Sequence, residues 1–329
     1  MRKVCLVVLA LGLLLVPVFA AGQGEAGEQK TVDYPKKEIT LIVPWNPGGT
    51  NDLMARALQP VFKDMYNADL VVKNVPGGGS AVGIIEAMTA KPDGYTLGLS
   101  TSSFIALATQ GRVSNKIDDA TNIMLVAEEP VCMVVKAGGK YDDAQTLLSA
   151  AVKNPGKITV GIPGSNNVNQ AYATLLQKPL KTTFLFMPFD GGSRVIAELL
   201  GSHIDAGVLK PSEVINQVRA GELKIVGVFN KEGLALLPEV PTFEQLGYDV
   251  FTLGTIRHIA YLMGPKGIDP LVVEKITDMF TNALKSEAYQ AFADKVGIVA
   301  NPISGDEFQV FLNEVYEGLV NASREIFTK

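Results

Sequence analysis

The stretch IVPWNPGGTNDLMARAL, residues 42–58, decides the fold of this 329-residue chain. An apolar run ends here at a loop of proline and glycine, and an amphipathic segment begins immediately after the loop. A short apolar run bounded by such a loop is typical of a buried strand, and apolar residues recurring every three to four positions are typical of a helix. The stretch therefore predicts a strand, a glycine loop and a helix, in that order.

Three more loops of this kind follow apolar runs and precede helical patterns: NVPGGGSAVG (74–83), GIPGSNNVN (161–169) and MPFDGGSR (187–194). Between the loops, apolar runs alternate with helical patterns along the whole chain. The expected strands are 39–43, 70–72, 95–99, 132–135, 158–162, 184–187, 204–208 and 223–228. This alternation is typical of an α/β fold in which parallel sheets carry helices on both faces.

Two helices have recognisable patterns. The first presents one apolar stripe, which Pro60 should kink or divide; its members are Leu53, Met54, Ala57, Leu58, Val61, Phe62 and Met65. The last helix should begin after Ser304, which forms a capping box with Glu307 ahead of a second apolar stripe.

The glycine loops do not match nucleotide-binding motifs. A P-loop needs a lysine that reaches the outer phosphates, and no lysine stands in any of the four loops. A dinucleotide loop needs GxGxxG, whereas Gly77, Gly79 and Gly83 give only GxGxxxG. A general property remains, because the N-terminus of a helix has unpaired N–H groups and attracts anions.

Polar residues in these loops can donate hydrogen bonds to an anion or can cap the helices; they are Thr50, Asn51, Ser80, Ser165, Asn166 and Asn167. One helix end contributes about 0.3 to 2 kcal/mol, and a charge-assisted hydrogen bond about 1.5 to 3 kcal/mol. Micromolar binding requires about 8 kcal/mol. Two facing sets of loops are therefore expected, on either side of a cleft that closes over a small anion.

The N-terminus is expected to be a secretory signal peptide over residues 1–20, with basic residues, an apolar core and a small residue at the end. Residues 21–33 are expected to be a mobile leader. Cys5 lies too early to accept a lipid, and Cys132, among apolar neighbours, is expected to be a buried strand thiol. The length of the mature chain, about 309 residues, suggests two domains. The signal peptide predicts that they lie outside the cytoplasm.

Composition excludes several classes of function. The formal net charge is −5, and no basic run is present, so we expect no nucleic-acid partner. His203 and His258 are the only histidines and have no metal-ligand spacing, so we expect neither a metal nor a cofactor. No GxSxG motif is present, which disfavours a serine hydrolase of the usual type.

The sequence resembles the substrate-binding proteins of tripartite tricarboxylate transporters, the Bug or TctC-type family. The resemblance rests on YPKKEITLIVPWNPGGTNDLMARAL (34–58), VVKNVPGGGSAVGIIEAMTAKPDGYTLGLSTSS (71–103), KNPGKITVGIPGSNN (153–167), MPFDGGSRVIAELLGSHIDAGVLKPSEV (187–214), VRAGELKIVGVF (218–229) and LPEVPTFEQLGYDV (237–250). The chain departs from the family where TIRHIAYLMGPKGID (255–269) replaces an aromatic-glycine motif.

The resemblance implies a two-domain periplasmic-binding fold of the Venus flytrap type, with the ligand cleft between the domains. The chain would cross near Glu129 and return near Gly254, giving one domain of 34–129 plus 254–329 and a second of 130–253. Family members capture small carboxylates and deliver them to a membrane permease, which implies a transport function. We expect the protein to be a monomer. The residues implied to bind ligand are Trp45, Asn46, Gly48, Gly49, Thr50, Asn51, Gly164, Ser165, Asn166, Asn167, Asp190, Gly191 and Gly192. Ser80, Ser100 and Ser102 are further candidates for ligand binding.

Two cations add to these candidates. Lys210 and Arg257 lie next to expected strands near the cleft and can meet a ligand carboxylate; the alternative for each is a surface position or an ion pair between domains. Asp190 either caps a helix or accepts the amino group of a ligand. Two other functions remain open: a sensory receptor of the same fold that signals to a kinase, and an enzyme built on this fold.

Overall fold

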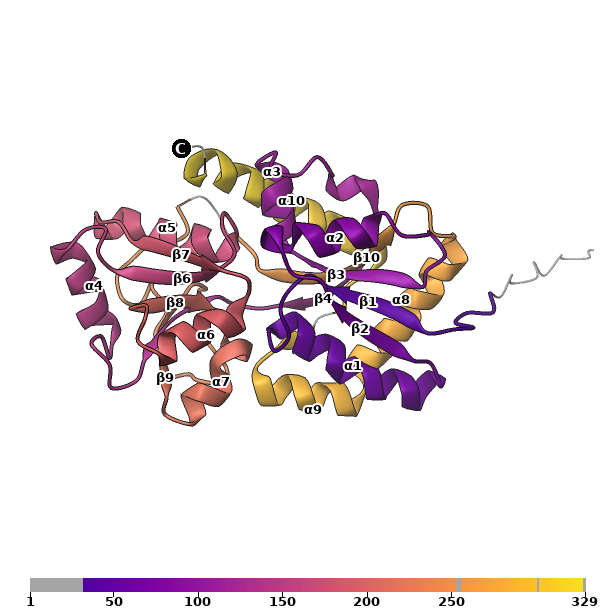
Figure 1. Cartoon of the computed structure of the whole chain (residues 1–329), viewed down its shortest axis with the longest axis horizontal. Coiled ribbons are helices and arrows are strands. Elements are labelled where there is room, and N and C mark those ends of the chain that lie inside the picture. The colour runs from indigo at the N-terminus through magenta and orange to yellow at the C-terminus, as the bar shows by residue number, and fades with distance from the viewer. Residues whose placement is uncertain (1–31, 253–255, 301, 328–329) are drawn as a thin grey trace, which may run out of the picture. The chain divides into compact units, whose positions relative to one another are not determined.

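The structure is a computed structural model that describes residues 32–252, 256–300 and 302–327 (Figure 1). The expected signal peptide, nearly all of the leader and the crossing at Gly254 lie outside these residues. Within the described residues the fold is a two-domain α/β fold built on two sheets. The strand order is β11-β4-β10-β3-β1-β2 in the six-stranded sheet and β7-β6-β8-β5-β9 in the five-stranded sheet.

The elements of the first sheet come from both ends of the chain. They are β1 (Ile39–Val43), α1 (Thr50–Tyr66), β2 (Leu70–Asn74), η1 (Gly78–Ser80), α2 (Ala81–Met88), β3 (Thr96–Thr101), α3 (Ser102–Thr109), η2 (Ile117–Asp119), β4 (Ala120–Glu128), β10 (Ile259–Pro265), α8 (Pro270–Lys285), α9 (Glu287–Val296), β11 (Val299–Ala300) and α10 (Gly305–Ile326).

The second sheet is built from the middle of the chain. Its elements are β5 (Cys132–Lys136), α4 (Ala144–Lys153), β6 (Thr159–Pro163), α5 (Val168–Leu180), β7 (Leu185–Phe189), α6 (Gly192–Leu200), β8 (Ala206–Leu209), α7 (Pro211–Arg219) and β9 (Leu223–Val228). The chain leaves the first sheet at the end of β4 and enters the second at the start of β5, so Glu129 lies in the crossing segment.

Both faces of the first sheet are buried, as the apolar runs predict. Ile42 packs in a cluster with Ile84 of α2 and Phe308 of α10, on the face that Figure 1 shows beneath α2, α3 and α10. The neighbouring strand residue Leu41 packs in a different cluster, with Met54 of α1 and Phe280 of α8. Successive side chains of a strand point to opposite faces, so a strand covered on both sides reads as a continuous apolar run.

The second sheet follows the same rule. Met133 of β5 belongs to the cluster that includes residues of α4 and α5, and Cys132 belongs to the cluster that contains Val195 of α6 and Val214 of α7. Cys132 is fully buried, and its Sγ lies 3.2 Å from the carbonyl oxygen of Leu209. The expectation of a buried strand thiol is therefore confirmed.

The sheets are mixed, whereas the sequence indicated parallel sheets. β1 pairs in parallel with β2 and β3, and β6 with β7 and β8. β10 is antiparallel to β3 and β4, β11 is antiparallel to β4, and β5 is antiparallel to β8 and β9. β5 and β10 enter their sheets from segments that cross between the sheets. They do not follow a strand-helix-strand crossover, so nothing constrains them to be parallel.

Two local predictions need correction. Pro60, which is exposed, does not divide α1, and Met65 at the end of the expected stripe is 43% exposed. Ser304 is the N-cap residue of α10, as expected, but its side chain makes no cap hydrogen bond, so the capping box does not form. The strands β4, β10 and β11 were absent from the expected set; in β4 the polar residues Thr121 and Asn122 precede the apolar residues and interrupt the pattern near its start.

Phe62 provides a test of the first core. Its side chain is fully buried and its ring centre lies 4.7 Å from that of Phe280. Phe62→Ala should lower the free energy of unfolding by about 3 to 5 kcal/mol, because the buried ring atoms no longer contribute their transfer free energy and because they leave a cavity in the core. Met65→Ala on the same helix is the matched exposed control and should change it by less than about 1 kcal/mol. Urea denaturation measures both; equal effects would contradict this packing.

Candidate functional site

The glycine loop after β1 is held by the first turn of α1. The N–H of Gly48 donates to Oδ2 of Asp52 at 2.9 Å, and Gly48 has φ +85, a left-handed conformation that favours glycine. Asp52 is buried and also accepts hydrogen bonds from Arg56 (2.9 Å) and Asn74 (3.0 Å). Asp52 therefore shapes the loop, which agrees with the expectation of a carboxylate stabilised in a first helical turn.

The N-termini of two helices in this region have no side-chain cap. Gly49 is the N-cap residue of α1 and Gly191 that of α6, and neither helix receives a side-chain cap hydrogen bond. By contrast, Asn167 caps α5 and accepts from the N–H of Gln170 at 3.0 Å. The first N–H groups of α1 and α6 thus keep the capacity to bind an anion, whereas α5 uses its own asparagine.

The loop of the first sheet lies against loops of the second. A Cβ placed on Gly164 would lie 3.6 Å from Cη2 of Trp45, and one on Gly191 would lie 3.7 Å from the backbone nitrogen of Asn46. The hydroxyl oxygens of Thr50 and Ser212 are 2.8 Å apart and share a hydrogen bond. A Cβ on Gly164 would also lie 3.4 Å from Cα of Gly79, so the loops 44–52 and 74–83 of the first sheet face the loops 161–169 and 187–194 of the second.

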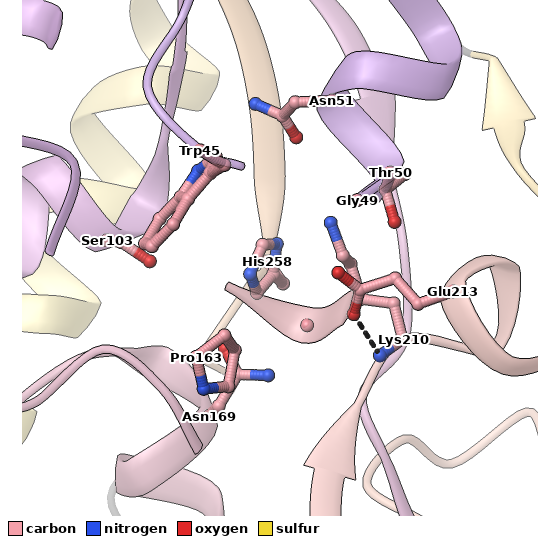
Figure 2. A pocket seen from close by; sticks show the side chains of 11 residues that line it. Trp45, Gly49, Thr50, Asn51, Ser103, Pro163, Asn169, Lys210, Glu213 and His258 are labelled. Carbon is pink, nitrogen blue, oxygen red and sulfur yellow. Dashed lines mark hydrogen bonds between the residues drawn. The ribbon is translucent and has the colours of Figure 1, made fainter. Parts of the chain in front are cut away.

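A small cavity lies where these elements meet (Figure 2). Its volume is about 20 Å³, enough for about one water molecule. The lining residues come from both sheets and their connections: Trp45, Gly49, Thr50, Asn51, Ser103, Pro163, Asn169, Gly192, Lys210, Glu213 and His258.

Lys210 and Glu213 supply the charges of the cavity wall. The ammonium of Lys210 is buried, and its Nζ lies 3.7 Å from Oε2 of Glu129 in the crossing segment. Oε2 of Glu213 accepts a hydrogen bond from the backbone N–H of Lys210 at 3.0 Å, the contact drawn in Figure 2. The wall therefore presents one cation and one anion side by side.

Burial sets the pKa values of the neighbouring groups. Burial raises the pKa of Glu129, and the Lys210 ammonium and the Ser212 hydroxyl partly offset that effect. The pKa of His258 is well below its usual value because the ring is buried and stands near Lys210. His258 is therefore neutral near pH 7.

Six of the predicted site residues line the cavity: Trp45, Gly49, Thr50, Asn51, Gly192 and Lys210. Others border it, among them Asn46, Gly48, Gly164 and Gly191, which make the loop contacts described above. Ser80 and Ser100 are fully buried and do not line the cavity, and Ser165 and Asp190 are exposed. Asn166 is tied by its carbonyl to Gln110 at 2.8 Å, so it joins α3 to the second sheet.

Two predicted residues have structural partners. The hydroxyl of Ser102 donates to the carbonyl of Arg257 at 2.7 Å and accepts from the N–H of Ile259 at 2.8 Å. Nη1 of Arg257 lies 2.8 and 3.0 Å from the two carboxylate oxygens of Glu128, and its guanidinium stands 5.3 Å from the ring centre of Phe311. Arg257 lines a different cavity, of about 910 Å³, and does not line the small one.

Asp190 does not cap α6, whose N-cap is Gly191.

Five lining residues were not among the predicted site residues: Ser103, Pro163, Asn169, Glu213 and His258. Ser103 and Pro163 are sequence neighbours of the predicted residues Ser102 and Gly164, so extending each predicted segment by one residue includes them. Glu213 carried a signal too, because an acidic residue in the first turn after Pro211 suggests a capping role. In the sequence, nothing distinguishes Asn169 from other polar residues near the start of a helix. Only the packing of α5 brings its side chain to the cavity.

Comparison with known proteins now identifies the family. A model described as the tripartite tricarboxylate transporter family receptor matches residues 54–318. The chain belongs to this receptor family. Protein BugT of Bordetella pertussis is 26% identical over 324 residues, which cover 96% of this chain and 98% of BugT.

Solved structures agree with the receptor fold. One described as a periplasmic transporter has a TM-score of 0.82 at 27% identity, covering 89% of this chain and 98% of that protein. MatC from Rhodopseudomonas palustris with bound malate has a TM-score of 0.78 at 21% identity, covering 87% of this chain and 100% of MatC. Receptors of this family are periplasmic solute-binding proteins.

In the part of the chain that the structure describes, no group of side chains could hold a metal ion. None of the helices described there combines the length and the apolar character that a membrane span requires.

Asp52 makes the loop sensitive to acid. Burial opposes its charge, but hydrogen bonds from Arg56, Gly48 and Asn74 outweigh burial and lower the pKa of Asp52. A carboxylate whose pKa is lower in the folded state stabilises the fold above its unfolded pKa, about 3.9, and loses that contribution as the pH falls through the folded pKa. Asp52→Asn should therefore be less stable than the parent at pH 7, and the difference should shrink below about pH 4.

Thermal or urea unfolding at pH 7 and pH 3 measures this difference. Asp64→Asn, an exposed change on the same helix, is the control and should behave like the parent at both pH values. A difference for Asp52→Asn that is independent of pH would show that the carboxylate charge does not hold the loop.

Proposed function

We propose that this protein is an extracytoplasmic receptor that captures a small organic carboxylate in the small cavity and delivers it to the membrane permease of a tripartite tricarboxylate-type transporter. The observation that carries the proposal is the convergence of two uncapped helix N-termini and a buried ammonium on one cavity. Membership of the receptor family supports it. The malate bound to MatC illustrates the class of ligand.

The energies fit a small anion. Each helix N-terminus contributes about 0.3 to 2 kcal/mol, and a charge-assisted hydrogen bond about 1.5 to 3 kcal/mol. The N-termini of α1 and α6, the ammonium of Lys210 and two or three hydrogen bonds together reach the roughly 8 kcal/mol of micromolar binding. No covalent step is part of this function, and we propose a binding protein that acts as a monomer.

Binding requires the walls of the cavity to separate. A volume of about 20 Å³ holds a water molecule but not a dicarboxylate. Only residues 129–131 separate β4 from β5, so a rotation of the two sheets about this segment can open the cavity without unfolding either core. On this proposal the moving bodies are the domains 34–129 plus 254–329 and 130–253, and the exported chain starts after a signal peptide at residues 1–20.

The first prediction for this function concerns ligand-induced stabilisation. Di- and tricarboxylates, acidic amino acids and aromatic acids should be screened by thermal shift, and a true ligand at 100 times its Kd should add about 2.7 kcal/mol of stability. Trp45 is the only tryptophan of the chain and lines the cavity, so the same ligands should change its fluorescence. The absence of any shift at millimolar concentration across the screen would refute carboxylate binding.

The second prediction concerns Lys210. Removing this ammonium should weaken carboxylate binding about tenfold or more, since a charge-assisted hydrogen bond is lost. Lys210→Met alone would leave Glu129 buried without its cation, so the informative variant is the pair Lys210→Met with Glu129→Gln. Lys224→Met, at a half-exposed cation of β9, is the control, and titration calorimetry measures all three. Unchanged affinity in the paired variant would mean that Lys210 only supports the crossing segment.

A further inference from the structure

The cavity wall contains two hydrogen-bond acceptors that an unsubstituted carboxylate, which has no donor, cannot use. Asn169 is 1% exposed, and its Nδ2 donates to the carbonyl of Val208 at 3.0 Å. A carbonyl only accepts, so this bond fixes the amide orientation. The Oδ1 of Asn169 has no hydrogen-bond partner among the described residues. A buried acceptor of this kind is costly unless a donor reaches it.

Glu213 is the second acceptor. Its Oε2 accepts from Lys210 N–H at 3.0 Å, while its Oε1 faces the glycines of both uncapped helices. A Cβ on Gly192 would lie 2.3 Å from this oxygen, and one on Gly49 would lie 3.7 Å from it. Figure 2 shows the carboxylate directed into the cavity beside Lys210. An anion therefore stands next to the place where the helix N-termini would receive the carboxylate of a ligand.

Lys210 is the one cation among the described lining residues, and its ammonium already lies 3.7 Å from Oε2 of Glu129, so the carboxylate of Glu213 has no cation of its own in the wall. His258 is neutral because burial lowers its pKa. A dicarboxylate would bring a second negative charge toward Glu213 with no further cation in the wall. A zwitterion would pair its carboxylate with the N-termini and Lys210, and its ammonium with Glu213. In an α-amino acid these two groups share one carbon, which matches the adjacency of Glu213 to Gly49 and Gly192.

We propose that Glu213 and Asn169 determine specificity by accepting hydrogen bonds from the ammonium group of the ligand, so that the receptor selects α-amino acids over hydroxy acids and unsubstituted acids. This inference rests on the proposed carboxylate-binding function and narrows its ligand class. A hydroxyl supplies one donor and no charge, whereas an ammonium supplies three donors and a charge opposite to that of Glu213.

Matched ligand series test the inference. Titration calorimetry on the purified mature protein should compare aspartate, malate and succinate; leucine, 2-hydroxy-4-methylpentanoate and 4-methylpentanoate; and phenylalanine, phenyllactate and phenylpropionate. Within each series only one substituent changes. We expect the amino member to bind about tenfold or more tightly than its two analogues in every series that binds.

The outcomes separate this inference from the function on which it rests. If a hydroxy or unsubstituted acid binds as tightly as its amino analogue, the selection of amino acids is overturned while carboxylate binding stands. If the carboxylate screen finds a ligand but none of the nine acids binds, the selection of amino acids is overturned. If neither the screen nor any of the nine acids gives binding, both are overturned.

Variants identify the residues responsible. Glu213→Gln keeps the side-chain oxygen that caps α7, so the fold should persist, with a melting temperature close to that of the parent. We expect it to weaken the amino ligand about tenfold and to leave the unsubstituted acid within about threefold. Asn169→Leu should reduce the same preference. Glu222→Gln, an equal change of charge at an exposed position, should bind like the parent. Equal losses for all members of a series in Glu213→Gln would show a purely structural role and would overturn the proposal.

Discussion

The buried ion pair between Lys210 and Glu129 organises the region in which the two sheets meet. Each charge loses its hydration on burial, and the loss is tolerable only because the other lies 3.7 Å away. Glu129 belongs to the segment that crosses between the sheets, whereas Lys210 is the N-cap residue of α7. The pair therefore positions the start of α7 against the crossing, and with it Ser212, whose hydroxyl meets Thr50 of α1. The Lys210 ammonium thus stabilises the contact between α7 and the crossing segment whether or not a ligand is bound.

Close backbone approach is the second constraint. Gly192 has no room for a Cβ, because the carboxylate of Glu213 already fills that space. Gly48 and Gly164 adopt positive φ angles of 85° and 91° that favour glycine. These glycines allow the N–H groups of helix starts and loops to face a common cavity. Because α1 and α6 lack side-chain caps, their first N–H groups keep the capacity to bind an anion.

The prediction of strands and loops from the sequence succeeded where one local pattern sufficed. β1 and β9 have the expected bounds, and β2, β3, β5, β6, β7 and β8 differ from the expected ranges by one or two residues at their ends. β4, β10 and β11 were missed. They pair antiparallel with their neighbours, and strand direction depends on how the chain returns to the sheet, not on side-chain periodicity. Arg257 and Lys210 looked equivalent in the sequence, yet Glu128 pairs with Arg257 at the other cavity while Lys210 faces the proposed site.

The sequence by itself determined the alternation of strands and helices, the glycine loops at helix starts and the resemblance to the receptor family, because these depend on periodicity, backbone freedom and motif order. The tertiary structure alone decided which helix ends remain uncapped, which cation reaches the cavity, and that Glu213 and Asn169 join it. Those residues are separated by long stretches of chain, and their meeting depends on how α5, α6 and α7 pack against the second sheet and against the loop of the first. Side-chain partnership is a property of that packing, and no local pattern encodes it.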